Sequence, residues 1–187
     1  MKRCNYGCGR VQPDGWDNVD RLDLGQEFVL MDGCQCAVWR RSDDMHLVLN
    51  GYDCIVANHM LSDVGHHQLP KMLTDLRSIL ADGGVLRILV PDVVWAFESW
   101  ERGKEDWFPQ DERTGDLDAK FCTFVTWFGE SKSVFTWGYL SKLLLSAGFD
   151  NVTTPLGVGQ SRFDRPGMGI TELDGDRTTS LIIEAVK

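Results

Sequence analysis

Short apolar runs alternate with helical patterns of apolar residues along this chain. The runs favour strands, and apolar residues that recur with a period of about 3.6 favour helices between several of them. The predicted strands are residues 2–6, 16–20, 27–31, 53–58, 85–90, 149–154 and 178–186, and the predicted helices are 69–80, 93–100, 121–128 and 137–147. Residues 36–50 fit either a loop or a helix. The alternation predicts an α/β fold, a doubly wound sheet with helices on both faces.

The polar stretches do not separate a second domain from the first. A length of 187 residues is typical of one domain, so we expect residues 1–187 to form a single domain. Within it, the polar region around 103–118 predicts a lid-like insertion, and the glycine-rich region 157–176 predicts a long loop.

Acidic residues outnumber basic ones, with 28 Asp and Glu against 19 Lys and Arg and a formal net charge of −9. Such a chain has no general electrostatic attraction to nucleic acid or to an anionic membrane, so nucleic acid is not the expected partner. No window approaches the roughly 18 consecutive apolar residues of a membrane span, and no apolar signal region follows Lys2 and Arg3. These features favour a cytoplasmic protein and leave its oligomeric state open.

The six cysteines predict neither disulfides nor a metal centre. Without an export signal, reduced thiols are the default. The pairs Cys4–Cys8 and Cys34–Cys36 depart from the usual C-x2-C spacing of zinc sites, and no histidine cluster stands beside them. We therefore expect no bound metal and interpret the cysteines as small apolar side chains.

Residues with useful chemistry follow the predicted strands, at the edge where ligands bind in open α/β sheets. These residues are Gly7-Cys8-Gly9, Asp20, Asp32, Asn58-His59 and Asp92.

The G-x-G sequence at Gly7 lets the backbone approach a ligand closely. Gln12 stands where a dinucleotide fingerprint would have its third glycine, and the turn that follows leaves little room for a crossover helix. Asp20 ends the second strand 13 residues after Gly7, and a carboxylate there can accept both hydroxyls of a ribose. Nicotinamide binders place this acid roughly 20 residues on, so the spacing argues against NAD.

Five segments resemble, in order, the class I S-adenosylmethionine-dependent methyltransferases of a short subtype with GCG followed by GW and NVD. They are NYGCGRVQPDGWDNVD, YDCIVANHML, SILADGGVLRILVPD, LLLSAGF and RTTSLIIEAVK. The resemblance spans nearly the whole chain. It implies a Rossmann-like sheet, mostly parallel with an antiparallel C-terminal strand, and a transferase that uses S-adenosylmethionine on a small-molecule or saccharide acceptor.

The resemblance also implies a role for each strand end. Asp20 would hold the ribose, and Asn58 and His59 would lie beside the methionine and the sulfonium. The full set implied to bind the cofactor is Asn5, Tyr6, Gly7, Cys8, Gly9, Asp20, Met31, Asp32, Gly33, Asn58 and His59. Simpler interpretations stay open, because Asp20 and Met31-Asp32-Gly33 also suit ordinary turns, and Asn58 and His59 also suit a helix cap.

His59 and Asp92 are the candidate catalytic residues. An oxygen or nitrogen acceptor often has to lose a proton, and histidine is the natural base near neutral pH. His59 is better placed than His46, His66 or His67, whereas Asp92 would equally suit the cap of the following helix.

The sequence departs from the family pattern at Ser62-Asp63, where Glu-His is usual. This departure leaves a non-catalytic cofactor-binding module as the alternative function. A nicotinamide-dependent oxidoreductase is the third interpretation.

Overall fold

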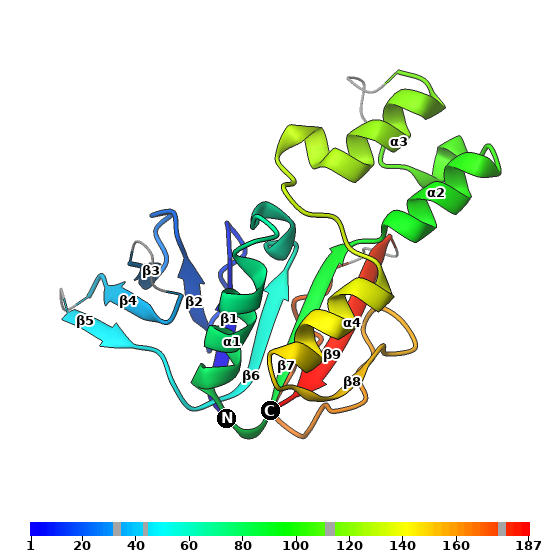
Figure 1. Cartoon of the computed structure of the whole chain (residues 1–187). Helices are drawn as coiled ribbons and strands as arrows, with labels where there is room; N and C mark the ends of the chain where they lie inside the picture. The colour runs from blue at the N-terminus through cyan, green and yellow to red at the C-terminus, as the bar shows by residue number, and fades with distance from the viewer. Residues whose placement is uncertain (32–34, 43–44, 111–114, 176–178) are drawn as a thin grey trace.

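The computed structural model describes residues 1–31, 35–42, 45–110, 115–175 and 179–187. In these residues nine strands form one sheet in the order β5-β4-β3-β2-β1-β6-β7-β9-β8 (Figure 1). The strands are β1 (Arg3–Tyr6), β2 (Asp17–Asp20), β3 (Phe28–Leu30), β4 (Ala37–Arg40), β5 (Met45–Val48), β6 (Tyr52–Asn58), β7 (Leu80–Pro91), β8 (Asp150–Thr153) and β9 (Ser180–Val186).

Strands β1, β2, β3, β6 and β7 run parallel, and the strand order reverses at β1, with β2 on one side and β6 on the other. The last strand, β9, pairs antiparallel with β7 from Val85 opposite Val186 to Pro91 opposite Ser180. The predicted fold class is confirmed: a mixed α/β sheet, mostly parallel, with an antiparallel C-terminal strand. Ligands bind at the carboxyl edge of such a sheet, beside the reversal of strand order.

The described residues contain four α-helices: α1 (Leu69–Ile79), α2 (Val93–Glu101), α3 (Leu117–Thr126) and α4 (Trp137–Ser146). Helices α1 and α4 cover one face of the sheet (Figure 1). They do so because their apolar residues share one side, with Leu69, Leu73 and Leu76 fully buried in α1. Helix α4 begins where the Thr136 hydroxyl accepts a hydrogen bond from the Tyr139 amide.

The opposite face of the sheet is covered by the long segment of residues 154–175. Met168, Ile170 and Leu173 from this segment pack on Val56 and Leu89 of the sheet. The connections 7–16 and 21–27, between the first three strands, contain no helix. Helices were expected on both faces, and on this face apolar side chains of an irregular segment take their place.

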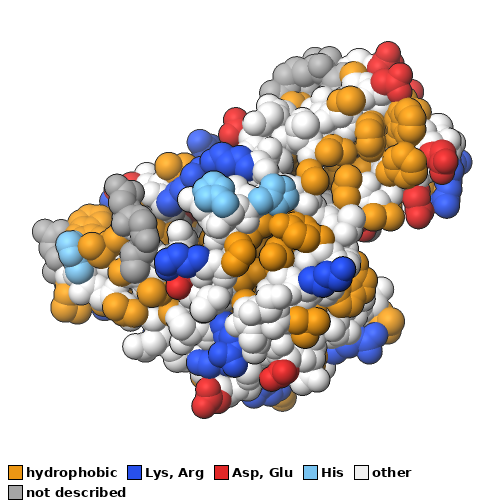
Figure 2. Space-filling view, viewed as in Figure 1, with side chains coloured by type: hydrophobic (Ala, Val, Ile, Leu, Met, Phe, Trp, Pro, Cys, Tyr) orange, Lys and Arg blue, Asp and Glu red, His pale blue; other side chains and the backbone are white. Residues whose placement is uncertain are grey.

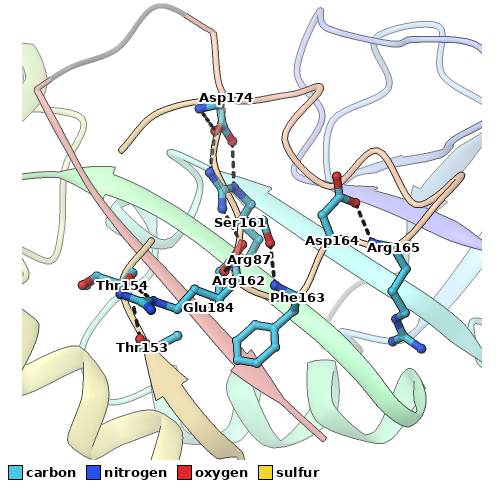
Figure 3. A network of polar contacts seen from close by, with 11 residues as sticks. Arg87, Thr153, Thr154, Ser161, Arg162, Phe163, Asp164, Arg165, Asp174 and Glu184 are labelled. Atoms are coloured by element: carbon cyan, nitrogen blue, oxygen red, sulfur yellow. Dashed lines mark hydrogen bonds and ion pairs between the residues drawn. The ribbon is translucent and has the colours of Figure 1, made fainter. Parts of the chain in front are cut away.

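A buried ion network fastens this covering segment to the sheet (Figure 3). The Arg87 guanidinium on β7 donates from Nε to Asp174 Oδ1 at 2.7 Å and from Nη1 to Glu184 Oε1 at 2.5 Å, and all three side chains are almost fully buried. The carboxylates also accept the backbone amides of Gly159 and Arg162, at 2.8 and 3.0 Å. Removing one partner of such a buried pair costs about 3–5 kcal/mol, because the other charge is then left buried and unpaired.

Helices α2 and α3 form a separate lobe above the carboxyl edge of the sheet (Figure 1). Its centre is aromatic, with Phe108 and Phe124 buried against Trp95 and Trp127. Figure 2 shows hydrophobic side chains exposed on this lobe. The described residues of the predicted insertion, 103–110 and 115–118, lie here, and its action as a lid stays a prediction.

The interpretation of residues 36–50 as a loop or a helix was wrong. Strands β4 and β5 pair antiparallel, with Val38 opposite Leu47. Strand β4 also pairs antiparallel with β3, with Trp39 opposite Val29. Each strand has only four residues, and only Val38 among the eight is fully buried. Too few apolar positions alternate for a strand pattern to appear in the sequence.

Candidate functional site

A cavity of about 590 Å³ opens at the carboxyl ends of β1, β2, β3 and β6. This volume suits a ligand the size of a nucleoside cofactor. Of the residues predicted from the sequence, it brings together Gly7, Gly9, Asp20, Met31, Asn58 and His59.

The backbone from Gly7 to Gly9 forms one wall of this cavity. Gly7 has φ +73°, and its amide donates to Val19 O at 2.8 Å. A Cβ on Gly7 would lie 2.5 Å from the Cβ of Met60, so only glycine fits. Gly9 has φ +53° and open space where a Cβ would stand. The wall is therefore bare backbone that a ligand can approach closely.

Asp20 lies beside this backbone and is 8% exposed. Its Oδ2 accepts the Gly9 amide at 2.9 Å, and its Oδ1 accepts the Leu22 amide at 3.0 Å. The two bonds orient the carboxylate and hold the glycine turn. An ionised carboxylate offers about four lone-pair positions, so Asp20 can still accept hydrogen bonds from a ligand.

Asn58 ends β6 on the opposite side of the cavity. Its Nδ2 donates to Leu173 O of the covering segment at 2.5 Å. Its Oδ1 is buried and has no hydrogen-bond partner among the described residues. A buried acceptor without a donor is costly, and a bound ligand with an N–H group would satisfy it.

His59 follows directly and has φ +57°, which is uncommon for a residue other than glycine. Its amide donates to Leu89 O at 2.8 Å, and its Nε2 lies 2.8 Å from Ser180 Oγ. The half-buried imidazole thus stands in the cavity wall with a fixed orientation.

Asn5, Tyr6 and Cys8 do not line the cavity. The side-chain Nδ2 of Asn5 donates to Val11 O and to Asn18 Oδ1, and the Tyr6 hydroxyl donates to Gln35 O. These two side chains brace the segments around the cavity. Burial, with a smaller contribution from the Asp20 charge, raises the pKa of the Cys8 thiol to about 12, so it remains protonated.

Asp92 stands apart from this cavity. Its Oδ1 accepts the amides of Val94 and Trp95 at 3.0 and 3.1 Å, which is the helix cap considered as the alternative to a catalytic role. Asp92 lines a second groove of about 430 Å³, together with Ser180. Asp32 and Gly33 lie outside the described residues.

Sequence reasoning missed several lining residues. The apolar ones are Leu22, Leu24, Leu30, Met60, Val64 and Met72, and the polar ones are Arg21, Gln35, Asp63, Gln68 and Lys132.

Asp63 and Lys132 are the most informative of these residues. Burial raises the pKa of the Asp63 carboxyl, while the charges of Arg21 and Lys132 act in the opposite direction. Asp63 was visible in the sequence as a departure from the family pattern. No local sequence pattern indicates that Lys132 lines the cavity. It lies there because its backbone amide donates to Ser62 O, in a distant segment of the chain, at 2.7 Å.

Two further features were searched for in the described part of the chain. No group of three or more His, Cys, Asp or Glu side chains there could hold a metal ion. None of the helices found there has both the length and the apolar character needed to cross a membrane.

No protein-family model and no curated protein matches this chain. Solved structures do match. The whole chain aligns with S-adenosylmethionine-dependent methyltransferases from Archaeoglobus fulgidus (TM-score 0.55, 12% identity, 86% of that chain), Thermotoga maritima (0.54, 17%, 82%) and Mesorhizobium loti (0.51, 14%, 90%). It spans only about half of two longer matches, the CurJ carbon methyltransferase (48%) and the methyltransferase SibL (50%). At these identities the likeness concerns the fold: the chain has the fold of class I S-adenosylmethionine-dependent methyltransferases.

Proposed function

We propose that this protein is an S-adenosylmethionine-dependent methyltransferase that acts on a small-molecule or saccharide acceptor. The observation that carries the proposal is the arrangement of Asp20 beside the bare backbone of Gly7 to Gly9, at the reversal of strand order. In this fold an acid at the end of the second strand accepts the hydroxyls of a ribose. The short GCG subtype and the cytoplasmic location stay predictions.

The lining chemistry fits an adenosyl cofactor. Leu22, Leu24, Leu30 and Met31 give an apolar wall on the side of β2 and β3, where an adenine ring would pack. Asn58 Oδ1, on the side of β6, would accept an N–H of the amino-acid portion. Asp32 and Gly33 stay predicted contacts to the adenine.

The bound cofactor would supply a methyl group on a sulfonium, which is already activated for transfer. The main task of the chain is then to orient donor and acceptor. Asp20 and the glycine backbone would hold the nucleoside. His59 would take a proton from an oxygen or nitrogen acceptor, whereas Asp92, whose Oδ1 already caps α2, is the weaker catalytic candidate.

Isothermal titration calorimetry tests the cofactor assignment. We expect S-adenosylhomocysteine to bind and NADH to give no heat of binding. Asp20→Ala should weaken binding more than tenfold, because each charge-assisted hydrogen bond contributes about 1.5–3 kcal/mol.

Asp53→Ala is the matched control, since the Asp53 carboxylate accepts the Lys2 amide at the start of β6, at the opposite edge of the sheet. Binding of NADH alone would refute the proposal. Binding of the cofactor with no methyl transfer to any acceptor would favour the alternative, a non-catalytic binding module.

A further inference from the structure

Three of the four non-glycine residues with positive φ in the described chain lie in one contact group. They are His59 (+57°), Trp127 (+44°) and Phe128 (+58°). The rings of His59 and Trp127 are 6.3 Å apart, and those of Trp127 and Phe128 are 6.0 Å apart. Strained backbone of this kind gathers at functional sites and persists only where its surroundings over-determine it.

His59 is over-determined by separate hydrogen bonds to its backbone and its ring. The amide donates to Leu89 O at 2.8 Å, and the carbonyl accepts the Ser62 hydroxyl at 3.0 Å. The ring is held by Ser180, whose Oγ lies 2.8 Å from Nε2. The backbone bonds account for the left-handed conformation, but only a contact to the ring fixes the direction of the imidazole.

Strand pairing places Ser180 at the edge of the sheet. It is the first residue of β9 and pairs with Pro91, the last residue of β7. The antiparallel last strand therefore delivers a hydroxyl to the carboxyl edge of the sheet, where the parallel strands end. Ser180 also lines the second groove, whereas His59 lines the cavity, so the His59–Ser180 pair lies between the two.

We infer that Ser180 is a positioning residue that holds the His59 imidazole in one orientation at the cavity wall. The inference rests on the proposed function, because it assigns Ser180 a part in preparing His59 to receive a proton. A serine hydroxyl can donate to an unprotonated Nε2 or accept from an Nε2–H, so the bond fixes the direction of the ring in either tautomer. A positioning role would account for the contacts to both the backbone and the ring of His59.

Nuclear magnetic resonance of histidine-labelled full-length protein tests this directly, because the chain has only four histidines. His59→Gln identifies the His59 signals. At a pH where the ring is neutral, the ¹⁵N shift of Nε2 reports its hydrogen bond. We expect this shift to change in Ser180→Ala, because the hydroxyl that bonds to Nε2 is lost.

Ser180→Thr keeps the hydroxyl and should restore the original Nε2 shift. Ser78→Ala is the control, because the Ser78 hydroxyl bonds only to Asp75 O among the described residues, near the end of α1. General loosening of the fold in Ser180→Ala would instead broaden the signals of all four histidines.

Addition of S-adenosylhomocysteine separates this inference from the proposed function. It should shift the His59 signals in the unmodified protein and leave those of His46, on β5, in place. If the ligand binds but Ser180→Ala leaves the Nε2 shift unchanged, the role of Ser180 is refuted and the proposed function stands. If the unmodified protein does not bind the ligand, the proposed function fails whatever the Nε2 shift shows.

Discussion

Replacing Gly7 with alanine tests the close contact between the cavity wall and Met60. The new methyl group would lie 2.5 Å from Met60 Cβ and 2.6 Å from Met60 Cγ, and its residue would be forced to φ +73°. The left-handed conformation costs a residue with a Cβ about 1–2 kcal/mol. Overpacking adds about 1–3 kcal/mol, because Met60 Cβ is attached to backbone and cannot turn away.

Gly9→Ala isolates the steric part of this cost. Gly9 also has a left-handed conformation, φ +53°, but no atom lies within 4 Å of the position that a Cβ would take there. Gly9→Ala should therefore lose only the conformational part, about 1–2 kcal/mol. The expected difference between the two variants is the overpacking cost of about 1–3 kcal/mol.

Thermal unfolding followed by circular dichroism measures this difference. For a chain of this size 1 kcal/mol shifts the midpoint by about 2–4 °C, so Gly7→Ala should unfold well below Gly9→Ala. We measure stability and not ligand binding, because both glycines line the cavity and either substitution would also disturb a bound ligand. Equal midpoints would show that Gly7 does not touch Met60 in the way the structure describes.

Substitutions at two further positions test groups in the cavity wall. Asp63 has a raised pKa through burial, so its carboxyl favours folding below the ordinary pKa of about 4, and this contribution is lost as pH rises through the raised value. Asp63→Asn should thus raise the unfolding midpoint at pH 7 and lose this advantage in acid; an advantage that grows in acid would contradict the assignment. At His59, Gly should be more stable than Ala by about 1–2 kcal/mol, because both variants lack the ring and only Ala is strained at φ +57°. Denaturant unfolding compares them, and equal stability would contradict the left-handed conformation.

The sequence predicted the central fold because the buried strands have strong local signals. Strand β6 contains the apolar run CIVA, and the second half of β7 is the mostly apolar VLRILV. Asp92 and Thr136 are good helix caps with apolar stripes behind them. Asp20 and His59 could also be placed in advance, because a parallel sheet brings its strand ends to one edge.

Other parts of the site depend on contacts that no local pattern encodes. Asn58 bonds to the carbonyl of Leu173, and Lys132 bonds to the carbonyl of Ser62, so both hydrogen bonds join distant segments. The covering segment is held by Arg87 and its two acids, which appear in the sequence only as unrelated charges. Tertiary packing decided these features, whereas strand and helix periodicity decided the others.

A crystal structure of the protein with S-adenosylhomocysteine tests the central claim most directly. The account predicts that the ligand lies in the cavity, with ribose hydroxyls within hydrogen-bond distance of Asp20 and its sulfur on the side of Asn58 and His59. A ligand bound in the second groove beside Asp92, or a ribose that does not contact Asp20, would contradict it.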